Sequence, residues 1–298
     1  MTGSVEPGST WIRGNVYTGN ASSAAPDRSA GARYVTSRPS AMVNSTGFYY
    51  TVAPPNYEDF EASRVVNVKD VSGYRVAGDG TTDDMASVQA IINAAAGKQI
   101  VFFPHGNYLF SNTLHLPPGT RLVGEAWTVL IASGNNFKDP KNPRPLIEVG
   151  KPGDVGIAQM SDFILTVNDV LPGVTLIQVN MAGDKPGNVG FFNTHFTATG
   201  SNAARGGRNS ARLCAHFTQT SSAYFENSWV TGFGSSAAPG AVGGFLVEAL
   251  NGTWLLGIGT GKLASTSNSL KKNQSCENPS NFWLVGCRAP CSVPDQYP

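Results

Sequence analysis

Hydrophobic and polar residues follow two different periods along the chain, and the change falls near Gly97. Just before it, apolar residues recur at helical spacing, at Val88, Ile91, Ile92 and Ala95. Apolar positions three and four residues apart are typical of an amphipathic helix, and a glycine commonly ends one. The pattern predicts a single helix over about residues 84–96.

After residue 97 the apolar residues gather in short runs that read as strands. Examples are QIVFFP, NYLFS, TLHL, PLIEVG, VTLIQVN and ARLCAHFTQT. Pro-Gly, Gly-Asn or Gly-Ser pairs separate many of these runs, and no further ten-residue helical pattern intervenes. An alternation of strands and helices is therefore excluded as the main theme of the fold.

Two all-β architectures remain, a sandwich and a parallel β-helix. A sandwich needs tight hairpins, and Asn251-Gly252 is the one Asn-Gly pair between strand-like runs. A parallel β-helix stacks short strands in successive coils and needs a cap where its core is open. An amphipathic helix directly before the first coils suits that role. The order of elements favours a parallel β-helix over about residues 98–260 with a short N-terminal capping helix.

The flanks of this region lack a regular period. Residues 1–64 predict an irregular linker or wrapping segment, residues 65–261 the β-helix domain, and residues 262–298 an irregular tail. Three of the four cysteines, Cys276, Cys287 and Cys291, lie in that tail, and the fourth is Cys214. Free thiols or a tail disulfide both fit this distribution. A metal site does not, because no second cysteine pair has zinc spacing.

Composition narrows the possible partners. Charged residues make up 14% of the chain and the net charge is +1, against about 25% charged residues in an ordinary domain. We therefore expect no nucleic-acid partner and no membrane association. The N-terminus lacks the apolar core of a secretory signal. N-glycosylation sequons at Asn20, Asn44, Asn251 and Asn273 point the other way, though only weakly.

The motif GDGTTDD at residues 78–84 precedes the helix and concentrates three carboxylates. A calcium site is one interpretation of Asp79, Asp83 and Asp84. Capping of the helix N-terminus is simpler and is the one we favour. The four histidines are scattered, and neither His105 nor His216 has a serine or cysteine partner in a recognisable context. A hydrolytic triad is therefore not indicated.

The segment VKDVSGYRVAGDGTTDDMASVQAIINAA resembles the opening segment of the pectate-lyase superfamily. Further motifs resemble the second repeat of glycoside hydrolase family 55, which contains fungal, usually secreted, exo-β-1,3-glucanases. They are PPGTRLVGEAW, NPRPLIEVG, QMSDFILTV, SSAYFENSWV and GGFLVEALNGTWLLGIGTG. The resemblance covers about residues 65–261. It implies a right-handed, pectin-lyase-like parallel β-helix, an extracellular monomer and β-1,3-glucan as the polysaccharide substrate, with no cofactor and no metal.

The chain also departs from that family. Members carry two β-helical repeats with the substrate cleft between them, whereas the motifs here match the second repeat alone. TGFGSSAAPG stands after SSAYFENSWV where the family has an acidic stretch, and KLASTSNSLKKNQ follows GIGTG. A degenerate paralogue and a truncated gene product both fit, and either makes the activity of the isolated chain doubtful.

Hydrolysis of a glycosidic bond requires an acid for the leaving oxygen and a base or polar network for water. Glu248 in FLVEAL and Glu226 in AYFENSW are the catalytic candidates, and their separation in sequence suggests that they lie about one coil apart. On adjacent coils, outward side chains of one sheet would lie at a distance that suits an inverting pair. Trp127, Trp229 and Trp254 are candidates for stacking on sugar rings, although packing beneath loops is the simpler explanation for each.

Three functions follow from these observations. The first is inverting hydrolysis of β-1,3-glucan. The second is a non-catalytic β-helical fragment or polysaccharide-binding module. The third is a pectin-type hydrolase or lyase, which is weakest because neither an Asn-Thr-Asp strand nor a Gly-His-Gly turn occurs.

Overall fold

The structure is a computed structural model of the 298-residue chain. It describes residues 45–47, 51–197, 210–231 and 243–249, together with the short strands β1, β2, β18, β19 and β20. The chain divides into two compact units, residues 1–51 with 290–298, and residues 52–289. In the first unit, β1 (Thr10–Ile12) pairs antiparallel with β2 (Ala32–Tyr34).

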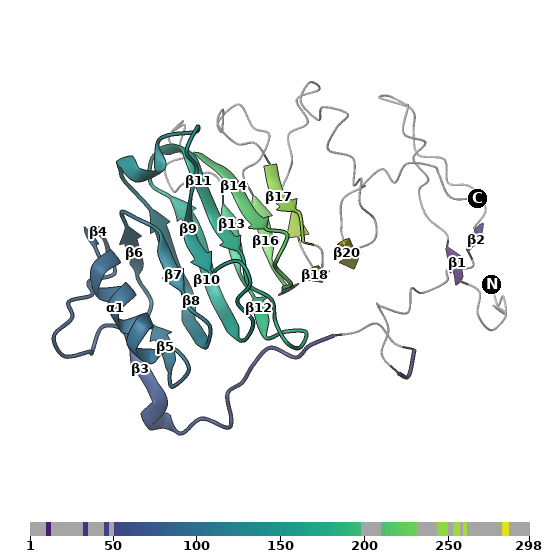
Figure 1. The fold of residues 1–298 in the computed structure, drawn as a ribbon, viewed down its shortest axis with the longest axis horizontal. Coiled ribbons are helices and arrows are strands. Elements are labelled where there is room, and N and C mark those ends of the chain that lie inside the picture. The colour runs from purple at the N-terminus through teal and green to yellow at the C-terminus, as the bar shows by residue number, and fades with distance from the viewer. Residues whose placement is uncertain are drawn as a thin grey trace. The chain divides into compact units, whose positions relative to one another are not determined.

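The larger unit is a stack of short parallel strands that form three faces (Figure 1). The five-stranded face consists of β7 (Leu114–Leu116), β9 (Arg144–Val149), β11 (Val170–Val179), β14 (Ser210–Phe217) and β17 (Gly243–Val247). The second face holds β3 (Val65–Asn67), β5 (Ile100–Phe103), β12 (Val189–Phe192), β15 (Tyr224–Glu226), β18 (Thr253–Leu256) and β20 (Phe282–Val285). The third holds β4 (Asp79–Asp83), β6 (Asn107–Phe110), β13 (His195–Thr197), β16 (Trp229–Thr231) and β19 (Gly259–Thr260). The long strands β8 (Thr120–Ala132) and β10 (Ala158–Val167) bend and contribute to both the second and third faces.

Every strand pairing described in the larger unit is parallel, so the predicted parallel β-helix is confirmed and the sandwich is excluded. One register position on successive coils is occupied by Val149, Val179, Phe217 and Val247. Each step between these residues is longer than the interval from Glu226 to Glu248. The prediction that this interval amounts to one coil was therefore wrong. One coil consists of three strands and three corners, and the stretch from Glu226 to Glu248 has too few residues to form them all.

One corner of the helix is built from a ladder of polar side chains. Asp162, Asn193 and Asn227 stand on successive coils between the second and third faces, each with a positive φ of 68°, 51° and 49°. Asn and Asp tolerate this left-handed conformation better than most residues. Asn193 Nδ2 donates to Asp162 Oδ1 at 2.9 Å, and Asn227 Nδ2 donates to Asn193 Oδ1 at 2.6 Å. The side chains thus stabilise the corner that the backbone has to make.

The core fills the space between the three faces with inward-pointing apolar residues. Phe191 and Phe225 occupy paired positions on neighbouring coils and stack with ring centroids 4.4 Å apart. Phe217 from the five-stranded face meets Phe225 edge to face at 5.1 Å. The interior is therefore a column of closely packed apolar side chains that joins the coils from Val68 to Ala249 in one hydrophobic core.

The predicted capping helix is present as α1 (Met85–Ala95) and lies at the N-terminal end of the stack (Figure 1). Its buried residues are the predicted ones, Val88, Ile91, Ile92 and Ala95. Gln89 fixes the helix to β7, because its amide accepts from the His115 backbone N–H at 2.7 Å and donates to the His115 carbonyl at 2.8 Å. The exposed end of the core is thereby covered.

Two of the three aspartates before α1, Asp79 and Asp84, act differently from the capping role we expected. Asp84 occupies the N-cap position but makes no side-chain capping hydrogen bond. Its fully buried carboxylate instead accepts from the backbone N–H groups of Ala77 and Gly78, at 2.7 and 2.9 Å. Asp79 folds its own turn by accepting from Thr81 and Thr82, and Asp83 accepts from the Met85 N–H at 3.1 Å. Most of the hydrogen bonds to these carboxylates therefore come from the loop before α1, and they stabilise that loop more than the helix.

A segment before the first coil packs along the outside of the second face. The Val52 N–H donates to the Tyr224 hydroxyl at 3.2 Å, and the Tyr57 hydroxyl donates to Gln159 Oε1 at 3.2 Å. The guanidinium of Arg121 lies over the ring of Phe60 at 5.0 Å. These residues belong to the range 1–64 for which we predicted a linker or wrapping segment, and its boundary at residue 64 stays a prediction.

Candidate functional site

The five-stranded face carries one row of polar side chains on its outer surface. His115 on β7 pairs with Glu148 on β9, Glu148 with Gln178 on β11, and Gln178 with His216 on β14. Each stands between two inward-pointing residues in the patterns LHL, IEV, IQV and AHF. Because side chains alternate along a strand, the polar member of each triplet faces outward. The row continues to Leu246 on β17.

Glu248 lies at the far end of this row, one residue beyond β17. Its backbone N–H donates to the Phe217 carbonyl at 2.8 Å and so extends the ladder of the sheet. Glu248 Oε2 and His216 Nε2 are 2.7 Å apart, which is a short hydrogen bond whose proton either partner can carry. The imidazole is 22% exposed and the carboxyl side chain 46% exposed. Glu248 therefore presents its carboxyl group to solvent while a more buried histidine holds it.

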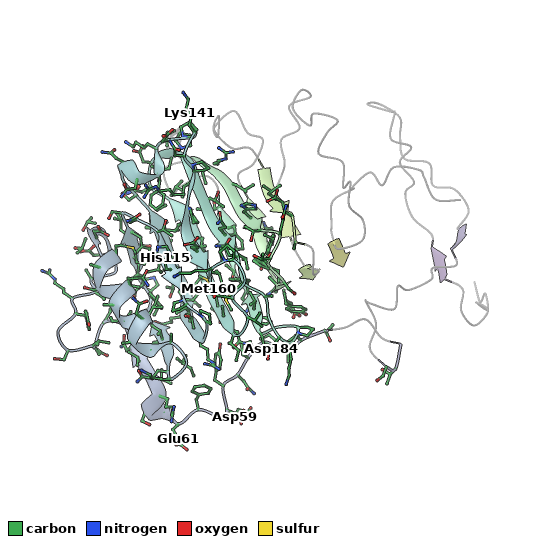
Figure 2. The ribbon with its side chains drawn as sticks, viewed as in Figure 1. Asp59, Glu61, His115, Lys141, Met160 and Asp184 are labelled. Atoms are coloured by element: carbon green, nitrogen blue, oxygen red, sulfur yellow. The ribbon has the colours of Figure 1, made fainter. Side chains whose placement is uncertain are left out.

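A second histidine–glutamate pair lies at the opposite end of the row. His115 Nδ1 and Glu148 Oε2 are 2.6 Å apart, on the paired strands β7 and β9. Figure 2 labels His115. Here Asn180, 2% exposed, donates its side-chain amide to Glu148 Oε1 at 3.0 Å. Both carboxylate oxygens of Glu148 are thus engaged. No described residue donates to Glu248 Oε1, and the Glu248 side chain as a whole is 46% exposed.

Glu226 lies on β15 in the second face, not in the five-stranded face that holds Glu248. The two candidates therefore do not form a row on one sheet as the coil argument predicted, because they are less than one coil apart. Glu226 Oε2 accepts from the Tyr224 hydroxyl at 2.8 Å, and that hydroxyl also accepts from the Val52 N–H. Glu226 is half-buried beside the segment that packs on this face.

Of the three candidate tryptophans, the structure describes the side chain of Trp229 alone. It is 53% exposed on β16 and its ring lies 6.4 Å from that of His195 on the neighbouring coil. Burial lowers the pKa of His195, so this imidazole favours the neutral form. An exposed indole beside a neutral imidazole is a surface on which a sugar ring can stack. The side chains of Trp127 and Trp254 lie outside the described residues.

Other possible centres can be assessed where side chains are described. Within residues 51–197, 210–231 and 243–249, no group of three histidine, cysteine or carboxylate side chains could hold a metal ion. Cys214 is a fully buried free thiol, and burial raises its pKa well above the usual value. The remaining cysteines lie outside the described residues. Among the described helices, none combines the length and apolar character that a membrane span requires.

Sequence reasoning proposed Glu248 as a catalytic candidate, which stays a prediction, and did not identify its hydrogen-bond partner. His216 was set aside because it had no serine or cysteine partner, whereas the structure gives it a carboxylate. His115, Glu148, Gln178 and Asn180 were missed as well. A signal for the row existed in the recurrence of a single polar residue between two apolar ones in successive strands.

Residues 65–243 match the family described as rhamnogalacturonase A/epimerase, pectate lyase-like. The chain belongs to this family. The match covers most of the β-helix and agrees with the resemblance of the opening segment to the pectate-lyase superfamily.

Among curated proteins, the chain is 39% identical over 221 residues to a glucan endo-1,3-beta-glucosidase of Trichoderma harzianum, covering 70% of this chain and 29% of that protein. It is 32% identical over 274 residues to a probable glucan endo-1,3-beta-glucosidase of Arthroderma benhamiae, covering 84% and 30%. A third relative, at 32% identity over 218 residues, is the non-secreted LysM effector LysM19 of Penicillium expansum, covering 65% and 17%.

These relatives confirm the resemblance to fungal β-1,3-glucanases that the sequence motifs indicated. The chain spans about 30% of the length of the two glucanases.

Proposed function

We propose that this β-helix acts on β-1,3-glucan as a glycoside hydrolase, with Glu248 as the residue that protonates the leaving glycosidic oxygen. The observation that carries the proposal is the His216–Glu248 pair, 2.7 Å apart, with the glutamate side chain 46% exposed. The names of the two glucanase relatives support the substrate class. Two polar groups in contact on an exposed face fit the acid–base chemistry of glycoside hydrolysis.

In the proposed inverting reaction, the bond between the anomeric carbon and the glycosidic oxygen breaks as Glu248 transfers its proton to that oxygen. A water molecule attacks the anomeric carbon from the opposite face and gives up a proton to a base. Glu226 is the candidate from the sequence, but it lies on the second face and Glu248 borders the five-stranded face, so this role requires the substrate to reach across the corner between them. Such a mechanism requires about 6.5–9.5 Å between the two carboxyl groups. His216 restores the proton of Glu248 through their hydrogen bond after each cycle.

Glu248 is a better acid candidate than Glu148, although both pair with a histidine. A general acid must reach the leaving oxygen within hydrogen-bond distance. Glu148 has one oxygen on His115 and the other on Asn180, so its approach to a substrate requires breaking one of those bonds. Glu248 can reach a substrate without losing its contact to His216.

The 298-residue chain by itself is proposed to hydrolyse β-1,3-glucan slowly. The family that it resembles works in a cleft between two β-helices, and orientation of a substrate can contribute about 7–11 kcal/mol to catalysis. One face binds a sugar chain from one side only. Most of that orienting effect is then lost even with Glu248 correctly positioned.

The test is release of reducing sugar from laminarin by the purified chain over long incubations. Glu248→Gln should lower the rate by at least about 100-fold, since a general acid contributes about 10²- to 10⁴-fold. Glu226→Gln tests the proposed base, and Glu61→Gln, an exposed glutamate before the first coil, is the matched control. Product size separates endo- from exo-cleavage, and the initial anomer in a proton NMR spectrum tests inversion. If Glu248→Gln and Glu226→Gln both hydrolyse laminarin as fast as the wild type, neither glutamate is catalytic.

A second candidate function is binding of polysaccharide without hydrolysis. The open outer surface of the five-stranded face, with alternating donors and acceptors, supports it. Retention of the chain on insoluble β-1,3-glucan, with no sugar release after prolonged incubation, would favour this function over hydrolysis.

We further propose that the protein acts as a secreted monomer. The four sequons and the glucanase relatives support export, while the name of the LysM19 relative points to a protein that is not secreted. Expression of the full-length gene product in a fungal host, followed by endoglycosidase treatment of cell and medium fractions, tests this. An unglycosylated cytosolic product would contradict the proposal, and size-exclusion chromatography with light scattering tests the monomer.

A further inference from the structure

A hollow of about 360 Å³ opens at the α1 end of the five-stranded face. Its lining residues with polar side chains are Asn93, His115, Glu148, Lys151 and Asp154. The volume lies at the lower end of the range for small-molecule sites, about 300–1,000 Å³. None of these residues takes part in the proposed hydrolysis.

The lining combines hydrogen-bond donors and acceptors with apolar ring surface. His115 is 62% exposed, so its ring faces the hollow while Nδ1 holds Glu148. The Lys151 ammonium makes no ion pair with the described carboxylates, and the Asp154 carboxylate fixes the Lys151 backbone N–H at 2.8 Å. Pro117 and Pro118 add non-polar surface. A sugar presents hydroxyl groups around its edge and C–H groups on its faces, and this lining matches both.

The polar groups of the hollow are held rigidly from below. Asn180 is 2% exposed and donates to Glu148 Oε1 at 3.0 Å and to the Gly150 carbonyl at 3.1 Å. Gln178 in turn donates to Asn180 Oδ1 at 3.1 Å. On the other side, Gln89 of α1 fixes the backbone of His115. Side chains held in this way lose little freedom when a ligand binds, which favours affinity.

Other ligand classes fit less well. An anion would meet the carboxylates of Glu148 and Asp154. A metal ion would need three ligands, and no such group exists in the described part of the chain. A purely structural ion pair would explain the contact between His115 and Glu148, but it would not explain a rigid polar floor beneath an open hollow.

The hollow also lies on the same outer row as Glu248. From His115 to His216 the row crosses three strand spacings, which is about 14 Å along the helix axis. We propose that this hollow is a second, non-catalytic subsite that binds a sugar unit of β-1,3-glucan and holds the chain along the five-stranded face. The inference rests on the proposed glucan substrate, but not on catalysis by Glu248.

The experiment is affinity electrophoresis of the full chain in native gels that contain laminarin, with dextran gels as a control for linkage. His115→Ala and Lys151→Ala should each weaken binding to laminarin by about tenfold or more. His105→Ala removes another exposed histidine, outside the hollow, and should leave binding unchanged. Near-identical circular dichroism spectra and melting temperatures of the variants would show that binding, not folding, has changed.

Laminarin retardation equal in wild type and His115→Ala overturns the subsite, as does an absence of laminarin binding by the wild-type chain. Equal retardation by dextran overturns its assignment to β-1,3-glucan. A chain that binds laminarin through His115 without hydrolysing it supports the subsite and contradicts the proposed hydrolysis. A chain that hydrolyses laminarin through Glu248 while His115→Ala binds normally supports hydrolysis and overturns the subsite.

Discussion

The two histidine–glutamate pairs on the five-stranded face have the same chemistry but opposite arrangements. In the pair near α1, the histidine is the exposed partner, at 62%, and Glu148 is 26% exposed and bonded through both oxygens. In the pair near β17, the histidine is 22% exposed and Glu248 46% exposed. A carboxylate held on both sides is suited to shaping a surface, whereas one held on a single side is available for reaction. Under the proposed function, this difference assigns binding to the α1 end of the five-stranded face and reaction to the β17 end.

The largest effect should come from the α1 end, at the buried carboxylate that orders the loop before the helix. Asp84→Ala leaves two backbone N–H donors, those of Ala77 and Gly78, without their acceptor. Each buried donor left unpaired costs about 1–3 kcal/mol, so two of them should lower the free energy of unfolding by about 2–6 kcal/mol. Urea denaturation monitored by circular dichroism measures it. Asp79→Ala, at an exposed turn, is the control, and equal losses in both variants would contradict this account.

The second largest effect should be on the rate of hydrolysis, through the histidine that contacts Glu248. His216→Ala removes the hydrogen-bond partner of Glu248 but leaves the carboxyl group in place. A hydrogen bond to a charged group is worth about 1.5–3 kcal/mol, so laminarin hydrolysis should slow by about 10- to 100-fold. His216→Gln can still donate to the carboxylate and should recover part of the loss. The pH–rate profile should change shape in both variants, and an unchanged rate in His216→Ala would remove the positioning role.

The support beneath the first pair can be tested through stability. Asn180→Ala removes the side chain that donates to Glu148 and to the Gly150 carbonyl. We expect a loss of about 1–3 kcal/mol in the free energy of unfolding, because buried acceptors lose their donors. Thr220→Ala removes a hydroxyl that donates to the Asn180 carbonyl at the rim of the same coil, and should cost less. A larger loss in Thr220→Ala would show that the side chain of Asn180 is not the main support.

Asp84, before α1, should also make the stability of the protein depend on pH. Burial raises the pKa of Asp84, although its backbone hydrogen bonds favour the ionised form. An aspartate whose pKa is higher in the folded than in the unfolded protein stabilises the fold most when it is protonated in both states, below its unfolded pKa of about 3.9. This stabilisation is lost as the pH rises from that value through the pKa in the folded protein. The stability of the wild type relative to Asp84→Asn should therefore decline above pH 4, by up to about 1.4 kcal/mol per pH unit.

Asp79 should show the opposite sign, since hydrogen bonds from Thr82 and Thr81 lower its pKa. Its contribution is present above pH 4 and is lost in acid. Denaturation series from pH 3 to 7 on Asp84→Asn and Asp79→Asn measure both trends. Trends of the same sign in the two variants would contradict the different environments described for these carboxylates.

The smallest effect on stability is expected at the exposed histidine of the first pair. His115→Ala breaks a contact in which the imidazole is mostly in water, and such pairs contribute about 0–1 kcal/mol. The melting temperature should hardly move, even though laminarin binding weakens. A loss clearly larger than this range would make His115 a structural residue and would weaken its role in the subsite.

The sequence predicted those features of the molecule that depend on local pattern. The apolar face of α1 was predicted residue by residue because helical periodicity is a local signal, and the parallel stack was predicted from the order of short runs. The contacts of Asp84 were not, because its acceptor role depends on how the loop at Ala77 and Gly78 folds back. The His216–Glu248 pair was missed because it forms between coils, across 32 residues of sequence. Strand register, which decides such pairs, is not a local property of the sequence.

The ladder of Asp162, Asn193 and Asn227 limits where residues can be inserted into or deleted from a β-helix of this kind during evolution. The ladder leaves only Asn193 and Thr194 between β12 and β13, and only Asn227 and Ser228 between β15 and β16. An inserted residue there would displace one rung of the ladder from the next. Insertions and deletions should therefore be rare at these two-residue corners, and differences in length among related chains should fall elsewhere in each coil.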